Sequence, residues 1–121
     1  MTSHQQIVDA TAATEATMRP QAVPVNMYEA SEALVIVAPL PAVQPTDVTV
    51  ELREGSLRFW SHLRSSGPRE YLLHEWEYGG YEREIELPAG YGSAVEATMA
   101  NGQLAIRVKR GEPTDLSLHP H

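Results

Sequence analysis

Histidines and carboxylates are the side chains of this sequence that could perform acid–base or metal chemistry, because the chain has 5 His and 16 Asp+Glu but no cysteine. Without cysteine, a disulfide framework, a thiolate nucleophile and a zinc site of the finger or ribbon type are all excluded. The histidines are scattered and lack the spacing of paired metal ligands on a helix. His119-Pro120-His121 could chelate a metal loosely, but a solvated terminus explains it more simply. We expect no metal site and no cofactor.

A row of glutamates is the second candidate for chemistry. Glu82, Glu84 and Glu86 alternate along one segment, and alternate residues on one strand face are about 7 Å apart. Two carboxyls at such a distance could catalyse hydrolysis if they shared a cleft that separated their pKa values. The solvated face of a strand explains the row more simply. A small hydrolase therefore stays an alternative that requires a concave pocket with at least two of these three residues.

Charge and composition exclude further classes of function. The sequence contains no phosphate-binding loop, no dinucleotide fingerprint and no nucleophile elbow. Its 9 Lys+Arg against 16 Asp+Glu give a net charge of -7, which repels a phosphate backbone. We therefore predict a binding protein that is not an enzyme and that binds no nucleic acid.

Apolar runs are too short for a membrane span. The longest, residues 33–43, is interrupted by Pro39 and Pro41, whereas a spanning helix needs about 20 apolar residues. Residues 1–10 lack the positive start and apolar stretch of a secretory signal. The absence of cysteine fits a reducing compartment. We expect a cytoplasmic protein.

The hydrophobic pattern has a period of two, which is typical of β-strands. Val48, Val50 and Leu52 alternate with polar residues, and similar alternation recurs between Pro, Gly, Asn and Asp along the chain. Asn101-Gly102 between two alternating segments predicts a tight hairpin, because both central residues of its turn need positive φ. About seven short strands without a convincing helix predict an all-β fold, an antiparallel two-sheet sandwich.

The chain divides into three parts. Residues 1–22 are rich in Ala, Thr and Gln and cannot form a core, so they predict a flexible N-terminal arm. Residues 23–111 contain the alternating segments and form the sandwich domain. Residues 112–121 form a C-terminal extension in which Leu116-Ser117-Leu118 lies between two prolines. In an extended conformation both leucines project to one side, as is needed to fill two pockets beside a strand edge.

Arg83 is the unusual residue of its segment, because it shares strand parity with apolar neighbours such as Tyr81 and Ile85. One interpretation is an edge position from which the guanidinium reaches water or a nearby glutamate. The other is a paired arginine at a dimer interface, where its five donors satisfy carboxylates or carbonyls of a second chain.

Two motifs carry a resemblance to a known family. Residues 97–106, Ala-Thr-Met-Ala-Asn-Gly-Gln-Leu-Ala-Ile, resemble the A-x-x-x-n-G-v-L signature of the α-crystallin domain of small heat-shock proteins. Residues 78–88, from Tyr78 to Pro88, are similar to the Y-G-x-F-x-R-x-x-x-L-P strand of that Hsp20-like family, in its bacterial type. The likeness covers about residues 22–110, and the Leu-x-Leu tail resembles the family's I-x-I motif. It implies an immunoglobulin-like antiparallel sandwich.

The resemblance also implies a function and a set of site residues. The function is that of an ATP-independent holdase, a stress chaperone that binds partly unfolded proteins and suppresses their aggregation. The family's groove between two edge strands receives the tail of a neighbouring subunit. Carried over to this sequence, the groove is bordered by Val48, Val50, Ala97 and Met99 and is filled by Leu116 and Leu118.

A homodimer, and larger homo-oligomers built from it, are further implications of the resemblance. Arg83 would lie at the dimer interface, and the segment 69–73, with Tyr71, Leu72 and Leu73, would match the loop strand that bacterial and plant members exchange between protomers. The alternative from another class is a non-enzymatic co-chaperone or scaffold that binds one specific folded partner.

Overall fold

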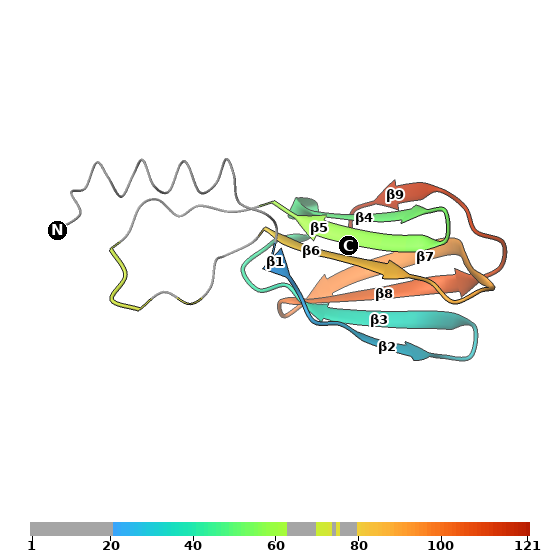
Figure 1. The fold of residues 1–121 in the computed structure, drawn as a ribbon, viewed down its shortest axis with the longest axis horizontal. Helices are drawn as coiled ribbons and strands as arrows, with labels where there is room; N and C mark the ends of the chain where they lie inside the picture. Colours follow the sequence, from blue (N-terminus) through green and yellow to red (C-terminus); the bar gives the residue numbers. More distant parts are fainter. Residues whose placement is uncertain (1–20, 63–69, 74, 76–79) are drawn as a thin grey trace.

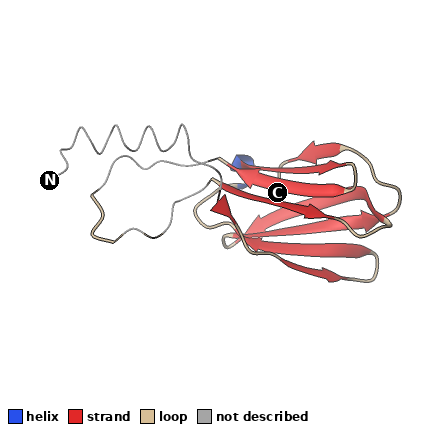
Figure 2. Ribbon diagram, in the orientation of Figure 1, coloured by secondary structure: helices blue, strands red, loops and turns tan. Residues whose placement is uncertain are grey.

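The computed structural model describes residues 21–62, 70–73, 75 and 80–121, and Figure 2 shows that strands account for nearly all regular structure in this part of the chain. One short 3-10 helix, η1, spans Pro45–Asp47. The strands of the described part, labelled in Figure 1, are β1 (Gln21–Ala22), β2 (Asn26–Glu29), β3 (Ala33–Pro39), β4 (Val48–Arg53), β5 (Ser56–Ser61), β6 (Tyr81–Glu86), β7 (Tyr91–Ala100), β8 (Gln103–Arg110) and β9 (Leu116–Leu118).

The strands form two sheets that share one hydrophobic core. One sheet has the strand order β1-β6-β5-β4-β9 and the other has the order β2-β3-β8-β7. Neighbouring strands are antiparallel, except that the short β1 runs parallel to β6. Among the described residues, a cluster of buried apolar side chains contains residues from both sheets. The antiparallel two-sheet sandwich predicted from the sequence is thereby confirmed.

Buried and more exposed residues alternate along β4, so one face of this strand is turned to the core. Val48, Val50 and Leu52 are buried, whereas the residues between them lie on the opposite, more exposed face. Burying an aliphatic side chain of this size stabilises the fold by about 1.5–3 kcal/mol. The other fully buried large side chains of the core are Leu34, Ile36, Leu40, Leu57, Phe59, Leu104, Ile106 and Val108.

The continuous apolar run in β3 is buried mainly on its core-facing side. Leu34 and Ile36 point into the core, and Val35, on the opposite face, is buried as well. β3 is an inner strand of its sheet, because it is hydrogen-bonded to β2 on one side and to β8 on the other.

Two tight turns set the register of the hairpins. Asn101 and Gly102 join β7 to β8 with φ values of 53° and 75°, which confirms the predicted hairpin. Glu54 and Gly55 join β4 to β5 with φ values of 50° and 79°. Both turns have two central residues of positive φ. The backbone twist of such a turn matches the right-handed twist of the flanking strands.

Some sequence predictions fall at or beyond the limits of the described residues. β1 occupies residues 21–22, the last two of the expected N-terminal arm, and the rest of that arm lies outside the described residues. Of the segment 69–73, Arg69 also lies outside them, and residues 70–73 are not in a strand. Within the described ranges, the chain has no helix long and apolar enough to cross a lipid bilayer.

The first residues of β7 lie close to the segment that leaves β8. The β7–β8 register shifts between Tyr91 and Val95, and the Ser93 hydroxyl donates to the Arg110 carbonyl oxygen. Gly111 follows with φ of 129°, and a Cβ at this glycine would lie 2.8 Å from Ser93 Cβ. The tail therefore leaves the sandwich through a contact that only glycine permits.

This close approach predicts a difference between two glycine substitutions. Gly90 also has positive φ, 89°, but a Cβ there would meet nothing within 4 Å. We expect Gly90→Ala to lower the free energy of unfolding by about 1–2 kcal/mol through backbone strain alone. Gly111→Ala adds a steric clash and should cost about 1–3 kcal/mol more. Chemical denaturation of both variants measures the difference, and equal losses would contradict the described packing.

Candidate functional site

The four residues expected to border a groove lie on two strands that contact each other from opposite sheets. Val48 and Val50 belong to β4 and are completely buried, and Ala97 and Met99 belong to β7. Ala97 is buried and Met99 is partly buried against the core. β4 and β7 contact each other, and β7 is one of the two edge strands of its sheet in the described part of the chain. The neighbouring edges of these two strands form the candidate functional site.

The Leu-x-Leu segment forms β9 and fills this groove. β9 pairs antiparallel with β4, with Leu118 opposite Val50, Ser117 opposite Glu51 and Leu116 opposite Leu52. Figure 1 shows β9 returning along β4 after a long connection from β8. Both leucines pack against the core cluster, whereas Ser117 is exposed. Leu116 and Leu118 therefore lie on the same, core-facing side of β9.

Residues after β9 reach the second edge of the groove. His119 Nδ1 lies 2.7 Å from the Val48 carbonyl oxygen, and since a carbonyl only accepts, the ring donates from Nδ1. Pro120 is buried. His121 N donates to the Ala97 carbonyl oxygen at 3.0 Å, and Met99 N donates to His121 O at 2.8 Å. The tail thus crosses from β4 to β7 and joins the two sheet edges.

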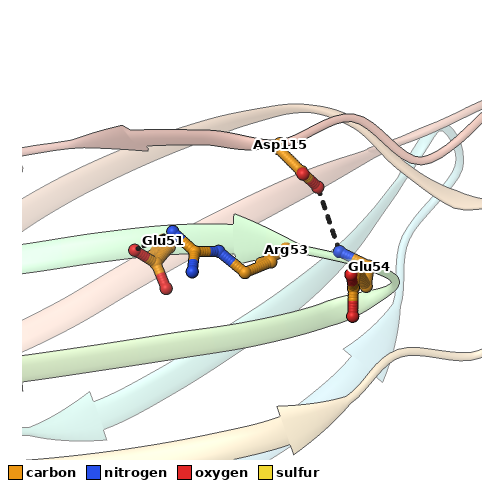
Figure 3. Close-up of polar contacts among 4 residues, drawn as sticks. All are labelled: Glu51, Arg53, Glu54 and Asp115. Atoms are coloured by element: carbon orange, nitrogen blue, oxygen red, sulfur yellow. Dashed lines mark hydrogen bonds and ion pairs between the residues drawn. The ribbon is translucent and has the colours of Figure 1, made fainter.

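Residues before β9 are held at the opposite end of the groove. Thr114 donates to the Gly92 carbonyl oxygen twice, from N at 3.0 Å and from Oγ1 at 3.1 Å. Asp115 Oδ1 accepts a hydrogen bond of 3.0 Å from Glu54 N at the β4–β5 turn, as drawn in Figure 3. Charged acceptors make stronger hydrogen bonds than neutral ones. The tail therefore contacts β7, then β4, then β7 again.

Sequence analysis missed the contribution of residues 119–121. The sequence pattern suggests a loose metal site or a solvated terminus, whereas in the structure His119 and His121 bond to β4 and β7. The described residues contain no group of three or more His, Cys, Asp or Glu that could hold a metal ion. A signal was present in the sequence, because Leu116, Leu118 and Pro120 continue one alternation of apolar residues.

The acidic row lies on the outer face of the sandwich. Glu82 Oε1 accepts a hydrogen bond of 2.9 Å from Arg58 Nε, and the Arg58 guanidinium stacks 4.3 Å from the centre of the Trp60 ring. A shallow depression on this face is lined by Glu51, Arg53, Glu54, Ser56, Arg58 and Glu84. It contains one residue of the row, Glu84, whereas the hydrolase hypothesis requires two. The geometry of the described residues therefore does not favour hydrolysis.

Arg83 contacts its own chain. It lies opposite Phe59, on the core-facing side of β6, and is partly buried. Its Nη1 donates to the Val23 carbonyl oxygen at 3.0 Å, just before β2. The guanidinium thus holds the segment between β1 and β2 against β6.

Tyr71, Leu72 and Leu73 lie between β5 and β6 and are among the exposed large apolar residues. The exposed fraction is 46% for Tyr71 and 75% for Leu73, and Leu72 is fully exposed. The three residues therefore place apolar side-chain surface on the outside of the chain, ahead of β6.

The packing of β9 predicts the effect of removing one leucine. Leu118→Ser takes an apolar side chain out of the groove, and we expect the docked tail to lose about 1–2 kcal/mol. Amide hydrogen exchange in β4 and β9 should become faster, while exchange in β3 and β8 stays slow. The matched control is Ser117→Ala, whose side chain points outward. If Leu118→Ser and Ser117→Ala give the same exchange in β4, the leucine does not hold the tail.

Comparisons with known proteins agree with this architecture. The model of the Hsp20/alpha crystallin family matches residues 26–117. The solved structure of hspA from Xanthomonas axonopodis is 26% identical, with a TM-score of 0.66 over 74% of this chain and 93% of that chain. A small heat-shock protein from Xylella fastidiosa is 23% identical, with a TM-score of 0.64 over 76% and 88%. Heat shock protein 16.0 from Schizosaccharomyces pombe is 18% identical, with a TM-score of 0.66 over 93% and 88%.

The comparison with curated proteins finds no match to this sequence. The family model nevertheless covers more than half of the chain, including every strand from β2 to β8 and the beginning of the docked tail. The chain belongs to the Hsp20/α-crystallin family of small heat-shock proteins.

Proposed function

We propose that this protein is an ATP-independent holdase that binds partly unfolded proteins and suppresses their aggregation under stress. The observation that carries the proposal is the groove between β4 and β7, which takes an extended segment with aliphatic side chains two residues apart. Partly unfolded proteins expose such segments together with unpaired strand edges. Membership of a chaperone family supports the same function.

Strand addition suits a chaperone that must bind many different proteins. Hydrogen bonds between backbones, as between β4 and β9, do not depend on side-chain identity. The groove selects only for apolar side chains at alternate positions. The net charge of -7 keeps the chaperone dispersed while it holds apolar clients. Nothing in this binding mode requires nucleotide hydrolysis or a cofactor, and the cysteine-free composition supports a cytoplasmic location.

We also propose that the functional unit is a homodimer that can assemble further. Exposed apolar side chains support this proposal. They are Met27 and Tyr28 on the edge strand β2, and Tyr71, Leu72 and Leu73 before β6. Among the described strands, β2 has a hydrogen-bonded neighbour on one side only, so its other side is open to a strand of a second copy. Arg83 would serve this interface by holding the segment before β2 in place through its bond to Val23.

The holdase proposal predicts protection without ATP. A heat-labile enzyme, heated with a molar excess of this protein, should scatter at least two-fold less light than the enzyme alone. Adding ATP should change nothing. The control is an inert globular protein of similar mass and charge at the same concentration. Equal scattering with either protein would contradict the holdase function, and a single stoichiometric partner in a pull-down would support the scaffold alternative.

The dimer proposal predicts that a variant without the exposed leucines before β6 dissociates into single chains at a higher protein concentration than the parent. Changing both Leu72 and Leu73 to Ser removes apolar surface that is exposed in the single chain, so folding should be unaffected. The dissociation constant of the dimer should rise at least ten-fold in sedimentation experiments over a concentration series. Glu70→Ser, an exposed polar change in the same segment, is the matched control. An unchanged mass distribution would place the interface elsewhere.

A further inference from the structure

The sheet that contains β4, β5 and β6 is covered to different extents at its two edges. At one edge, β9 pairs with β4 from Val50 to Leu52. At the other edge, the short β1 pairs with β6 only at Tyr81 and Glu82. β6 continues beyond this pair, and in the described part of the chain no strand lies beside residues 83–86 on that side. Such an edge presents backbone N–H and C=O groups with which an extended segment can pair.

The two faces of β6 differ in chemistry along this open edge. Ile85 is partly buried and packs against the core cluster, and Arg83, on the same face, is bonded within its own chain. Glu84 and Glu86 lie on the outer face and are exposed. A strand added beside residues 83–86 would therefore meet apolar surface with its inward side chains and carboxylates with its outward ones.

The carboxylates of Glu84 and Glu86 are available to a partner. Arg58 lies opposite Glu84 on β5 but donates to Glu82 instead. Neither Glu84 nor Glu86 forms an ion pair with another described residue. Opposite charges on neighbouring strands stabilise the pairing of those strands, whereas like charges destabilise it. Lysine or arginine at alternate positions of an added strand would match both carboxylates.

The same carboxylates disfavour a second copy of this chain at this edge. If β6 pairs with β6 of another copy and both apolar faces stay on the core side, glutamates of one strand lie opposite glutamates of the other. Like charges at such positions destabilise the pair. The net charge of -7 on each chain adds to the repulsion. The edge therefore selects against self-association and in favour of a basic strand.

We propose that the open edge of β6 is a second binding site for extended polypeptide segments, and that it takes segments in which aliphatic residues alternate with lysine or arginine. The backbone of such a segment pairs with residues 83–86. Its aliphatic side chains continue the apolar face at Ile85, and its cationic side chains lie beside Glu84 and Glu86. The site is distinct from the edge of β4, because β5 lies between β4 and β6. It goes beyond the proposed function and does not depend on the tail.

Three labelled peptides of equal length test this site on the full chain. The first alternates lysine with valine, the second alternates glutamate with valine, and the third has the lysines and valines of the first in two separate blocks. We expect the alternating lysine peptide to bind at least ten-fold more tightly than either of the others. Its affinity should fall as salt is added, and amide hydrogen exchange in residues 83–86 should slow when it binds.

Charge reversal at the edge locates the site. Glu84→Lys/Glu86→Lys should bind the alternating lysine peptide at least ten-fold more weakly than the parent, and the glutamate peptide more tightly. Both positions are exposed, so the fold should be retained. Glu29→Lys/Glu32→Lys is the matched control, because it changes the net charge equally at two exposed glutamates near the β2–β3 connection. This control should keep the parent's order of affinities.

The outcomes separate this site from its alternatives. Failure of the parent to bind the alternating lysine peptide would overturn the proposal, and so would equal binding of the block peptide, because charge alone would then explain the binding. Equal losses in the two charge-reversal variants would also overturn it. Protection of residues 83–86 that rises with protein concentration without peptide would show that a second copy occupies the edge instead. Protection of a heated enzyme is a separate measurement, so intact protection without peptide binding would contradict this site and leave the holdase function standing.

Discussion

Unpaired backbone groups at the sheet edges are the constraint on which the rest of this structure depends. An open sandwich leaves a row of N–H and C=O groups on each edge strand, and such edges invite association with any other strand. Here one tail satisfies groups on two edges, because β9 pairs with β4 while Thr114 and His121 bond to β7. The tail therefore covers backbone groups that would otherwise lie unpaired on β4 and β7.

Placement of the groove follows from the packing of the two sheets. The alternation of Val48, Val50 and Leu52 turns one face of β4 to the core, so the same apolar face continues to the strand edge. Leu118 on β9 lies opposite Val50 on β4, so the apolar face of the sheet continues onto β9. The tail is therefore an addition to the first sheet, and any replacement must satisfy the same spacing of two residues.

Local pattern predicted the sandwich well, because alternation and turn residues act over a few positions. The Asn101-Gly102 hairpin and the two inward leucines of the tail are read directly from neighbouring residues. Contacts between residues distant in sequence left no such pattern. The bond of Arg83 to Val23 joins positions 60 residues apart, and that of Asp115 to Glu54 joins positions 61 apart. Which chain supplies the tail was likewise not encoded in the local pattern, since the same leucines fit the groove within one chain or between two.

In the structure the tail pairs with β4 of its own chain, and the rest of the site depends on this pairing. Isotope-filtered nuclear Overhauser spectra on an equal mixture of labelled and unlabelled chains test it most directly, through the methyl groups of Leu118 and Val50. We expect cross-peaks between these methyls within labelled chains and none in the spectrum filtered for contacts between chains. Strong Leu118–Val50 cross-peaks in the filtered spectrum would contradict the claim and show that the tail links one subunit to the next.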